Sequence, residues 1–218
     1  MLIKAVIYDM DGTLVDSEIV SEAAWHRTSE LMGVDVPKTM IRSFIGRNAA
    51  SVEGELAERL GGIDRAHEAF RIHAECFDEL ADTMLALKPS ARESIDSLRA
   101  AGCRIALATS TGRVRALARL ARFGLQDAFD SIICGDDGIK NGKPAPDIFL
   151  LAAERLSVEP ALCAVVEDSF NGVRAGYAAG MHVFMVPDLL APTDEIVAMC
   201  DAVLPSLTEL PAAVADIR

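Results

Sequence analysis

The sequence lacks the features that mark secreted, membrane-bound or nucleic-acid-binding proteins. Its 21 Lys and Arg residues are outnumbered by 33 Asp and Glu residues, and the resulting net charge of −12 would repel a nucleic-acid backbone or an anionic membrane surface. No apolar run approaches the roughly 18 residues of a membrane helix. The first residues also lack the basic region, apolar core and cleavage site of a signal peptide. We therefore expect a cytoplasmic protein, a monomer or weak oligomer, that binds neither nucleic acid nor membrane.

The sequence also lacks metal-binding cysteine patterns. Its five cysteines stand far apart, with no C-x-x-C pair and no His at zinc-ligand spacing. Most lie in apolar segments, so we expect buried free thiols in a reducing compartment rather than disulfides. They are Cys76, Cys103, Cys134, Cys163 and Cys200.

What is present is a chain of 218 residues, 51% of them hydrophobic, in which strand and helix patterns alternate. Short apolar runs predict strands at residues 3–8, 103–108, 130–134, 162–166 and 181–186, with a last strand from 202. Helix-period segments separate them, and this alternation predicts an α/β fold with a doubly wound, parallel, Rossmann-like sheet. Two helices have apolar stripes that we expect to face the core: Val114, Leu117, Ala118 and Ala121 in one, Phe149, Ala152, Ala153 and Leu156 in the other.

One block interrupts this alternation. From the helical pattern that begins near Asp16, residues up to about 87 continue as helix-period segments with no convincing strand, broken by Gly and Pro. The block resembles an insertion after the first strand. We expect a core of residues 1–16 and 88–218 and a helical domain of residues 17–87, with Trp25 in its interior.

Two carboxylates directly follow the first predicted strand. Asp9 and Asp11 are two residues apart, so on an extended chain they point the same way, and Gly12 lets the backbone approach a ligand. On its own, D-x-D-G could equally be a solvated turn. The alternative is an Asp nucleophile paired with an Asp acid/base.

Polar residues also follow the other predicted strands. The carboxyl ends of parallel strands share one edge of a sheet, where ligands bind in open α/β folds. Residues far apart in the sequence are therefore expected to meet there, and the helix opened by the segment around Lys143 reaches the same edge. The set comprises Asp9, Asp11, Thr109, Ser110, Thr111, Lys143, Glu167 and Asp168.

These residues form an ordered set of motifs. D-M-D-G-T, the strand-end Thr109, K-P-A-P-D-I-F and E-D-S resemble the four motifs of the haloacid dehalogenase (HAD) superfamily, over nearly the whole chain. The helical insertion is similar to that family's cap domain, which would close over the site. The last two motifs are similar to the β-phosphoglucomutase-like branch of sugar-phosphate phosphatases and mutases.

The resemblance implies a role for each motif residue. Asp9 would be the nucleophile that forms an aspartyl-phosphate, and Asp11 the general acid/base. Thr109 would donate to a phosphate oxygen, and Lys143 would offset the negative charge. A hard cation, Mg²⁺, would make the crowding of acids tolerable. Its ligands would be Asp9, Asp11 (through its backbone carbonyl), Asp168 and Glu167, the last as a ligand or behind one.

Further residues are candidates for binding phosphate or substrate, and each also has a structural interpretation. They are Gly12, Ser110, Thr111, Gly46 and Arg47, the last two at a position that resembles the family's cap loop near the substrate. A helix N-cap is the structural alternative for Thr109, and it competes with the functional role more strongly for Ser110 and Thr111. Glu167 and Asp168 could instead cap the helix that follows them. Arg47 could be a surface arginine.

The sequence leaves three functions to distinguish. We expect a Mg²⁺-dependent phosphatase acting on a small phosphorylated metabolite, a sugar phosphate. The alternative enzyme is a phosphomutase, but mutases of this branch tend to carry Val where this chain has Thr13, and a cap His that would fall at Ser21. A catalytically silent phosphate-binding module is a third candidate, disfavoured because every motif position is chemically competent.

Overall fold

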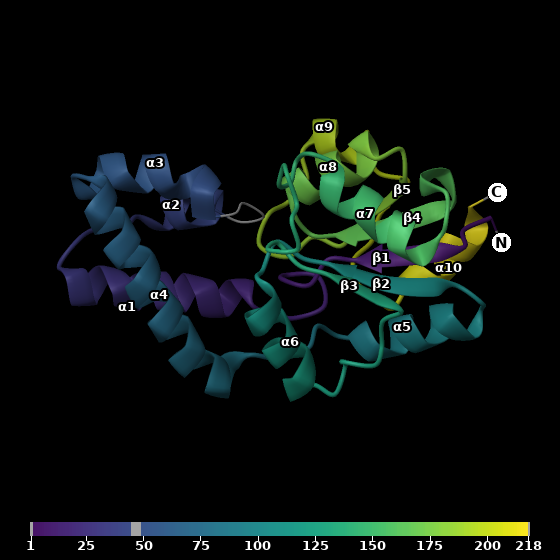
Figure 1. Cartoon of the computed structure of the whole chain (residues 1–218), viewed down its shortest axis with the longest axis horizontal. Coiled ribbons are helices and arrows are strands. Elements are labelled where there is room, and N and C mark those ends of the chain that lie inside the picture. The colour runs from purple at the N-terminus through teal and green to yellow at the C-terminus, as the bar shows by residue number, and fades with distance from the viewer. Residues whose placement is uncertain (1, 45–48, 218) are drawn as a thin grey trace. The chain divides into compact units, whose positions relative to one another are not determined.

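A six-stranded parallel sheet forms the centre of the larger part of the molecule (Figure 1). The computed structural model describes residues 2–44 and 49–217. The spatial strand order β3-β2-β1-β4-β5-β6 places the first strand in the middle and has every neighbouring pair parallel, which confirms the predicted doubly wound sheet. The strands are β1 Ala5–Tyr8, β2 Arg104–Ala108, β3 Ser131–Ile133, β4 Cys163–Glu167, β5 His182–Met185 and β6 Ala202–Val203.

The chain divides into two compact units. The first contains residues 1–15 and 87–218, and the second contains residues 16–86; each boundary lies one residue from the expected one. Helices of the first unit are α5 Ala91–Ala100, α6 Arg113–Arg122, α7 Asp147–Leu156, α8 Phe170–Ala178, α9 Asp194–Val197 and α10 Leu210–Asp216, with a 3₁₀ turn at Pro160–Leu162. Those of the second are α1 Glu18–Met32, α2 Lys38–Ser43, α3 Ala49–Leu60 and α4 Ile63–Met84.

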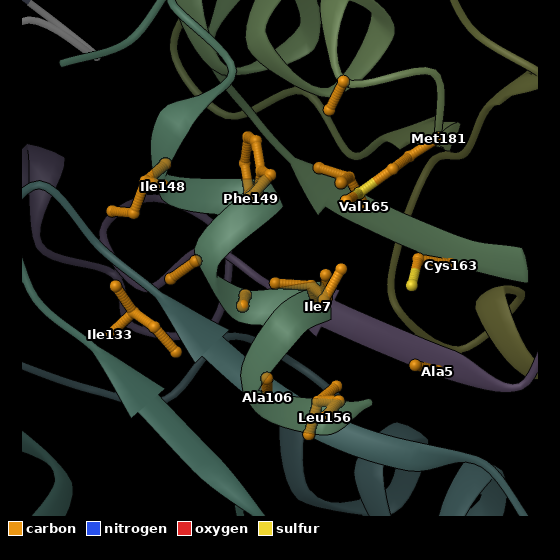
Figure 2. Packing of buried hydrophobic residues seen from close by; sticks show 14 of the residues in the cluster. Ala5, Ile7, Ala106, Ile133, Ile148, Phe149, Leu156, Cys163, Val165 and Met181 are labelled. Atoms are coloured by element: carbon orange, nitrogen blue, oxygen red, sulfur yellow. The ribbon is translucent and has the colours of Figure 1, made fainter. Parts of the chain in front are cut away.

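Helix α7 packs on the centre of the sheet. Its stripe of Phe149, Ala152, Ala153 and Leu156 is buried against alternate residues of β1, β2 and β4, as predicted (Figure 2). Helices α7 and α8 lie on one face of the sheet and α5 and α10 on the other (Figure 1). Covering both faces explains why the central strands are continuous apolar runs rather than alternating ones.

Helix α6 is oriented differently from the prediction. Val114 is 83% exposed and Leu117 36%, and Ala118 and Ala121 are exposed too, so the expected inward stripe faces solvent. The buried residues are Ala116 and Leu120. The prediction was wrong because it rested on the spacing of apolar residues alone. Two arginines of this helix pair with carboxylates of the same unit, Arg113 with Asp137 and Arg119 with Asp11, and of the two arginines only Arg119 is mostly buried.

The second unit has a core of its own around Trp25. This side chain is 3% exposed and packs edge-on against Phe44 and Phe70, as expected for an interior residue. His73 of α4 stacks on Trp25 at 4.4 Å between ring centroids, and its Nε2 lies 3.2 Å from the hydroxyl of Ser21. The sequence had suggested no partner for this histidine. The described residues of this unit contain no strand, in agreement with the prediction.

Two further expectations concern the chain as a whole. All five cysteines are free thiols, four of them buried, in agreement with the prediction. Within the described residues, no helix combines the length and apolar character needed to cross a membrane.

Replacing a core leucine of α7 should destabilise the first unit. Leu156 is fully buried, so we expect Leu156→Ala to lower the free energy of unfolding by about 2–5 kcal/mol, through lost burial and the cavity left behind. Leu150, on the same helix, is 40% exposed, so Leu150→Ala should cost less than about 1 kcal/mol. Urea denaturation followed by circular dichroism measures both. Equal losses would show that α7 does not bury the face described.

Candidate active site

The ends of three adjacent strands bring the polar residues of the site together. Tyr8 of β1 is in register with Leu107 of β2 and with Val166 of β4. The next residues along each strand therefore lie side by side, and the backbone N–H of Asp9 donates to the carbonyl of Val166 at 2.9 Å. The backbone hydrogen bonds between β1 and β4 thus fix the position of Asp9 at the end of β1.

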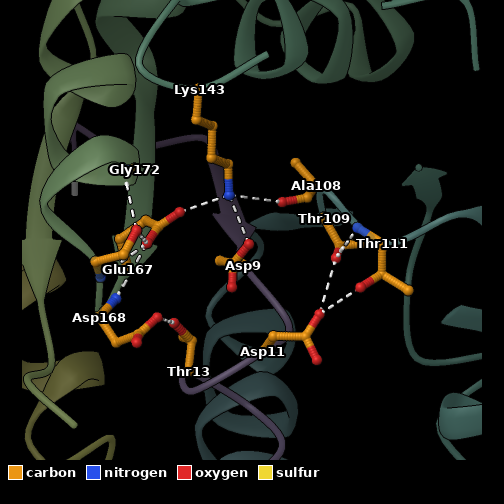
Figure 3. Close-up of polar contacts among 11 residues, drawn as sticks. Asp9, Asp11, Thr13, Ala108, Thr109, Thr111, Lys143, Glu167, Asp168 and Gly172 are labelled. Atoms are coloured by element: carbon orange, nitrogen blue, oxygen red, sulfur yellow. Dashed lines mark hydrogen bonds and ion pairs between the residues drawn. The ribbon is translucent and has the colours of Figure 1, made fainter. Parts of the chain in front are cut away.

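The side chain of Lys143 lies between two carboxylates (Figure 3). Its Nζ is 2.5 Å from Asp9 Oδ1, 2.5 Å from Glu167 Oε1 and 3.3 Å from the carbonyl oxygen of Ala108. The Lys143 side chain is 3% exposed, and the Phe149 ring lies 5.0 Å from Nζ. A buried ammonium needs such partners, because an unpaired charge in this environment would be costly.

Burial and neighbouring charges shift the pKa values of this pair. Burial raises the pKa of Asp9 well above its usual value; Lys143 opposes this, while Glu167 and Asp11 add to it. Burial alone would lower the pKa of Lys143, but the carboxylates of Asp9 and Glu167 outweigh it and hold that pKa above its usual value. Lys143 is therefore a permanent cation. Asp9 would be easier to keep ionised if a further positive charge were bound beside it.

The same edge of the sheet holds a group of oxygen ligands. Asp9, Glu167 and Asp168 are all buried, and each offers a carboxylate oxygen within 4.8 Å of the others. With the Lys143 ammonium, three ionised carboxylates carry a formal charge of −2. Oxygen donors at this separation suit a hard divalent cation such as Mg²⁺. The residues therefore fit a magnesium site.

Two residues of the first motif position Asp168. Thr13, fully buried, donates its hydroxyl to Asp168 Oδ1 at 3.1 Å. Gly12 has a φ of +82°, and a Cβ built there would lie 2.3 Å from Asp168 Oδ2. The backbone at this position therefore approaches the carboxylate in a way that only glycine permits. A valine at position 13 could not supply the hydrogen bond.

Glu167 is held by the start of helix α8 as well as by Lys143. Its Oε2 accepts from the backbone N–H groups of Asp168 and Ser169, at 3.2 and 3.1 Å, and from the Ser169 hydroxyl at 2.9 Å. The Ser169 hydroxyl also accepts from the N–H of Gly172 and caps the helix. Gly172 is required for space, since a Cβ there would lie 1.8 Å from the Glu167 carboxylate. Fixed in this way, Glu167 both binds Lys143 and presents an oxygen to the acidic cluster.

Asp11 is held by the segment that follows β2. Its Oδ2 accepts from the hydroxyls of Thr111 at 2.7 Å and Thr109 at 3.3 Å (Figure 3). Its Oδ1 forms an ion pair with Arg119 of α6. The Thr109 hydroxyl, fully buried, also accepts from the backbone N–H of Thr111 at 3.0 Å. Both threonine hydroxyls thus contact Asp11, whereas the sequence suggested that they bind phosphate.

The remaining candidates are less closely connected to the site. Ser110 lies half-buried in the loop after β2. Gly46 and Arg47 lie outside the described residues. Two contacts at the site were not predicted from the sequence: the ion pair of Arg119 with Asp11 and the hydrogen bond from Thr13 to Asp168. The D-G-T motif was a usable signal for Thr13, while Arg119 had none, because its helix was predicted to face the other way.

The polar groups at this sheet edge can be compared with those of known protein families. Residues 3–180 match the family model of haloacid dehalogenase-like hydrolases, and the chain belongs to this family. The motifs predicted the family, and the alternation of strand and helix patterns predicted its α/β fold.

Two named relatives and one solved structure are similar to this chain over most of its length. The chain is 37% identical over 185 residues to a phosphorylated carbohydrates phosphatase of Thermotoga maritima, covering 82% of each chain. It is 33% identical to a phosphoglycolate phosphatase of Nitrosospira multiformis, covering 95% of this chain and 93% of the relative. Among solved structures, CbbY from Rhodobacter sphaeroides in complex with phosphate superimposes with a TM-score of 0.82 at 30% identity, over 98% and 99% of the two chains.

Adding a methyl group at Gly12 should disrupt the site rather than the fold. We expect Gly12→Ala to lower activity by at least about tenfold, since the new Cβ would displace Asp168. The matched control is Gly102→Ala, at a φ of +90° with no heavy atom within 4 Å of the added Cβ. It should cost only about 1 kcal/mol of stability and leave activity unchanged. Circular dichroism and steady-state kinetics measure both effects, and equal activities in the two variants would contradict the contact.

Proposed function

We propose that this hydrolase is a phosphatase that removes the phosphoryl group from a small phosphorylated metabolite, a sugar phosphate. The observation that carries the proposal is the buried Lys143 ammonium between Asp9 and Glu167, with Asp168 in the same cluster. This arrangement supplies a fixed carboxylate nucleophile and positive charge in one place. The relatives named for phosphorylated carbohydrates and phosphoglycolate support a small phosphate monoester as substrate.

In the first step, a carboxylate oxygen of Asp9 attacks phosphorus. A bond forms between Asp9 and phosphorus, the bond from phosphorus to the alcohol oxygen breaks, and an aspartyl-phosphate results. Asp11, in its protonated form, gives its proton to the departing alcohol oxygen. Lys143 keeps Asp9 oriented and offsets part of the charge that gathers when a phosphate dianion approaches.

In the second step, the aspartyl-phosphate is hydrolysed. Asp11, now ionised, takes a proton from a water molecule as that water attacks phosphorus. The bond between phosphorus and Asp9 breaks, inorganic phosphate leaves, and both carboxyl groups return to their starting states. General acid/base catalysis supplies about 10²- to 10⁴-fold. Covalent catalysis, positioning and charge neutralisation must supply the remainder.

The acidic cluster would hold a Mg²⁺ ion through Asp9, Asp168 and Glu167. The motif resemblance implies the Asp11 backbone carbonyl as a further ligand. When bound, the ion would supply Lewis-acid charge to the phosphoryl oxygens and favour the ionised form of Asp9. Thr13 and Gly12 keep Asp168 in position for this role.

Replacing the nucleophile should abolish turnover. We expect Asp9→Asn to lower kcat by about 10⁴-fold or more, because an amide oxygen cannot form the covalent intermediate. Asp127→Asn, at an exposed aspartate, is the control and should retain activity. The measurement is phosphate release from a panel of sugar phosphates with Mg²⁺. Unchanged release by Asp9→Asn would refute the assigned nucleophile.

The same panel distinguishes the phosphatase from a phosphomutase. A phosphatase releases inorganic phosphate in amounts equal to the substrate consumed. A mutase using the same aspartyl-phosphate would convert one sugar phosphate to its isomer without net release. An isomer detected by ³¹P NMR without free phosphate would contradict the proposal, and no turnover of any substrate would favour a silent module.

Removal of divalent metal should abolish activity reversibly. Dialysis against EDTA is expected to eliminate phosphate release, and added Mg²⁺ to restore it. Because an ion that binds only the folded state stabilises it, Mg²⁺ should also raise the melting temperature. Asp168→Asn should weaken the apparent Mg²⁺ affinity at least about tenfold in both measurements, whereas Asp127→Asn should not change it. Full activity of the metal-free protein would contradict the site.

A further inference from the structure

Arg119 forms an ion pair with Asp11. It comes from the inward face of α6, between the buried Ala116 and Leu120, and its side chain is only 14% exposed. The Asp11 side chain is 22% exposed. The pair is therefore more sheltered than the exposed ion pairs that contribute little to stability.

Three contacts on Asp11 are divided between its two carboxylate oxygens. Arg119 binds Oδ1, while Thr111 and Thr109 donate to Oδ2 at 2.7 and 3.3 Å. All three partners come from β2, α6 and the loop between them. The carboxylate is thus fixed at both ends by one segment, although Asp11 itself lies in the turn after β1.

The electrostatic surroundings explain why such an anchor is needed. Asp11 is two residues from Asp9, which raises the pKa of Asp9 through like-charge repulsion, and the acidic cluster lies at the same edge of the sheet. Lys143 is already engaged by Asp9 and Glu167. Arg119 is a second cation, and its ion pair with Asp11 offsets the repulsion between this carboxylate and the acidic cluster.

We propose that Arg119 is a positioning residue: it holds the resting, ionised carboxylate of Asp11 in the direction from which Asp11, once protonated, serves the leaving group. The proposal rests on the acid/base role proposed for Asp11. Arg119 does not contact the reacting atoms; it acts by fixing the direction of the Asp11 carboxylate before substrate binds, and such outer contacts are typically worth 10- to 100-fold in activity.

The experiment compares two substrates whose leaving groups differ in their need for a proton. One is the sugar phosphate hydrolysed fastest by the wild type, which must release an alkoxide unless it is protonated. The other is p-nitrophenyl phosphate, whose phenolate leaves readily without a proton. The quantity compared is kcat/KM, because it includes only the steps up to departure of the leaving group.

Loss of the arginine should be selective for the sugar phosphate. We expect Arg119→Gln to lower kcat/KM for it about 10- to 100-fold through kcat, with KM little changed, and to lower kcat/KM for p-nitrophenyl phosphate by less than about threefold. Arg119→Lys, which retains the charge, should recover part of the loss. Arg113→Gln is the matched control, since Arg113 lies on the same helix and pairs with Asp137; it should show no selectivity between substrates.

A double-mutant cycle separates positioning from a structural role. In an Asp11→Asn background, Arg119→Gln should cause almost no further loss, because its effect passes through Asp11. Equal losses for both substrates, or a full additional loss in that background, would overturn the proposal.

The single variant Asp11→Asn tests the acid/base role itself. If it shows no selectivity for the leaving group, the role of Asp11 fails. If it is selective while Arg119→Gln is not, only the inference on Arg119 fails.

Discussion

The ammonium group of Lys143 lies between the buried carboxylates of Asp9 and Glu167, and the rest of the site is arranged around this contact. Without the lysine, two carboxylates would be buried side by side with no compensating charge, which costs several kcal/mol. Without the carboxylates, the buried lysine would be deprotonated or its side chain would move toward solvent. The strands that carry Asp9 and Glu167 are adjacent in the sheet, so the register of β1 and β4 and the position of Lys143 depend on one another.

The four carboxylates of the site are divided between two cations. Asp9, Glu167 and Asp168 form the cluster suited to a metal, and Lys143 offsets part of its charge. Asp11 is held separately by Arg119. The net charge of −12 means that an anionic substrate is repelled by the protein as a whole. The substrate can approach only where local cations reduce this repulsion, and the site has two of them.

The sequence predicted the sheet and most of the residues at its edge because parallel topology is a strong constraint. Once the apolar runs were assigned to parallel strands, the residues that follow them had to share an edge, wherever they stood in the chain. Lys143 could be added because its segment opens a helix at that edge. The inward face of α7 was predicted in a different way, from the helical spacing of its apolar residues. The prediction succeeded because that face is apolar throughout.

The failures have a common physical cause. Helix α6 has an apolar stripe that is exposed and arginines that are partly buried, because carboxylates of the core pair with them. A prediction from periodicity sorts residues into apolar and polar. It takes no account of a charged side chain that is neutralised by a partner far away in the sequence. The D-G-T motif marks Thr13 as part of the site, but the hydrogen bond from Thr13 to Asp168 spans 155 residues, and the motif does not reveal that partner. Local pattern thus gives the position of a side chain on its element, while its partners depend on tertiary contacts.

The central claim is that Asp9 becomes covalently phosphorylated, and the most direct test is chemical trapping of that intermediate. Wild-type protein mixed with substrate and quenched into borohydride should have Asp9 reduced to homoserine, because borohydride reduces acyl phosphates but not free carboxylates. Tandem mass spectrometry of the tryptic peptide after Lys4 can distinguish Asp9 from Asp11 and Asp16. We predict homoserine at position 9 only, and only when substrate is present. Its appearance at position 11, or its absence during rapid turnover, would contradict the account.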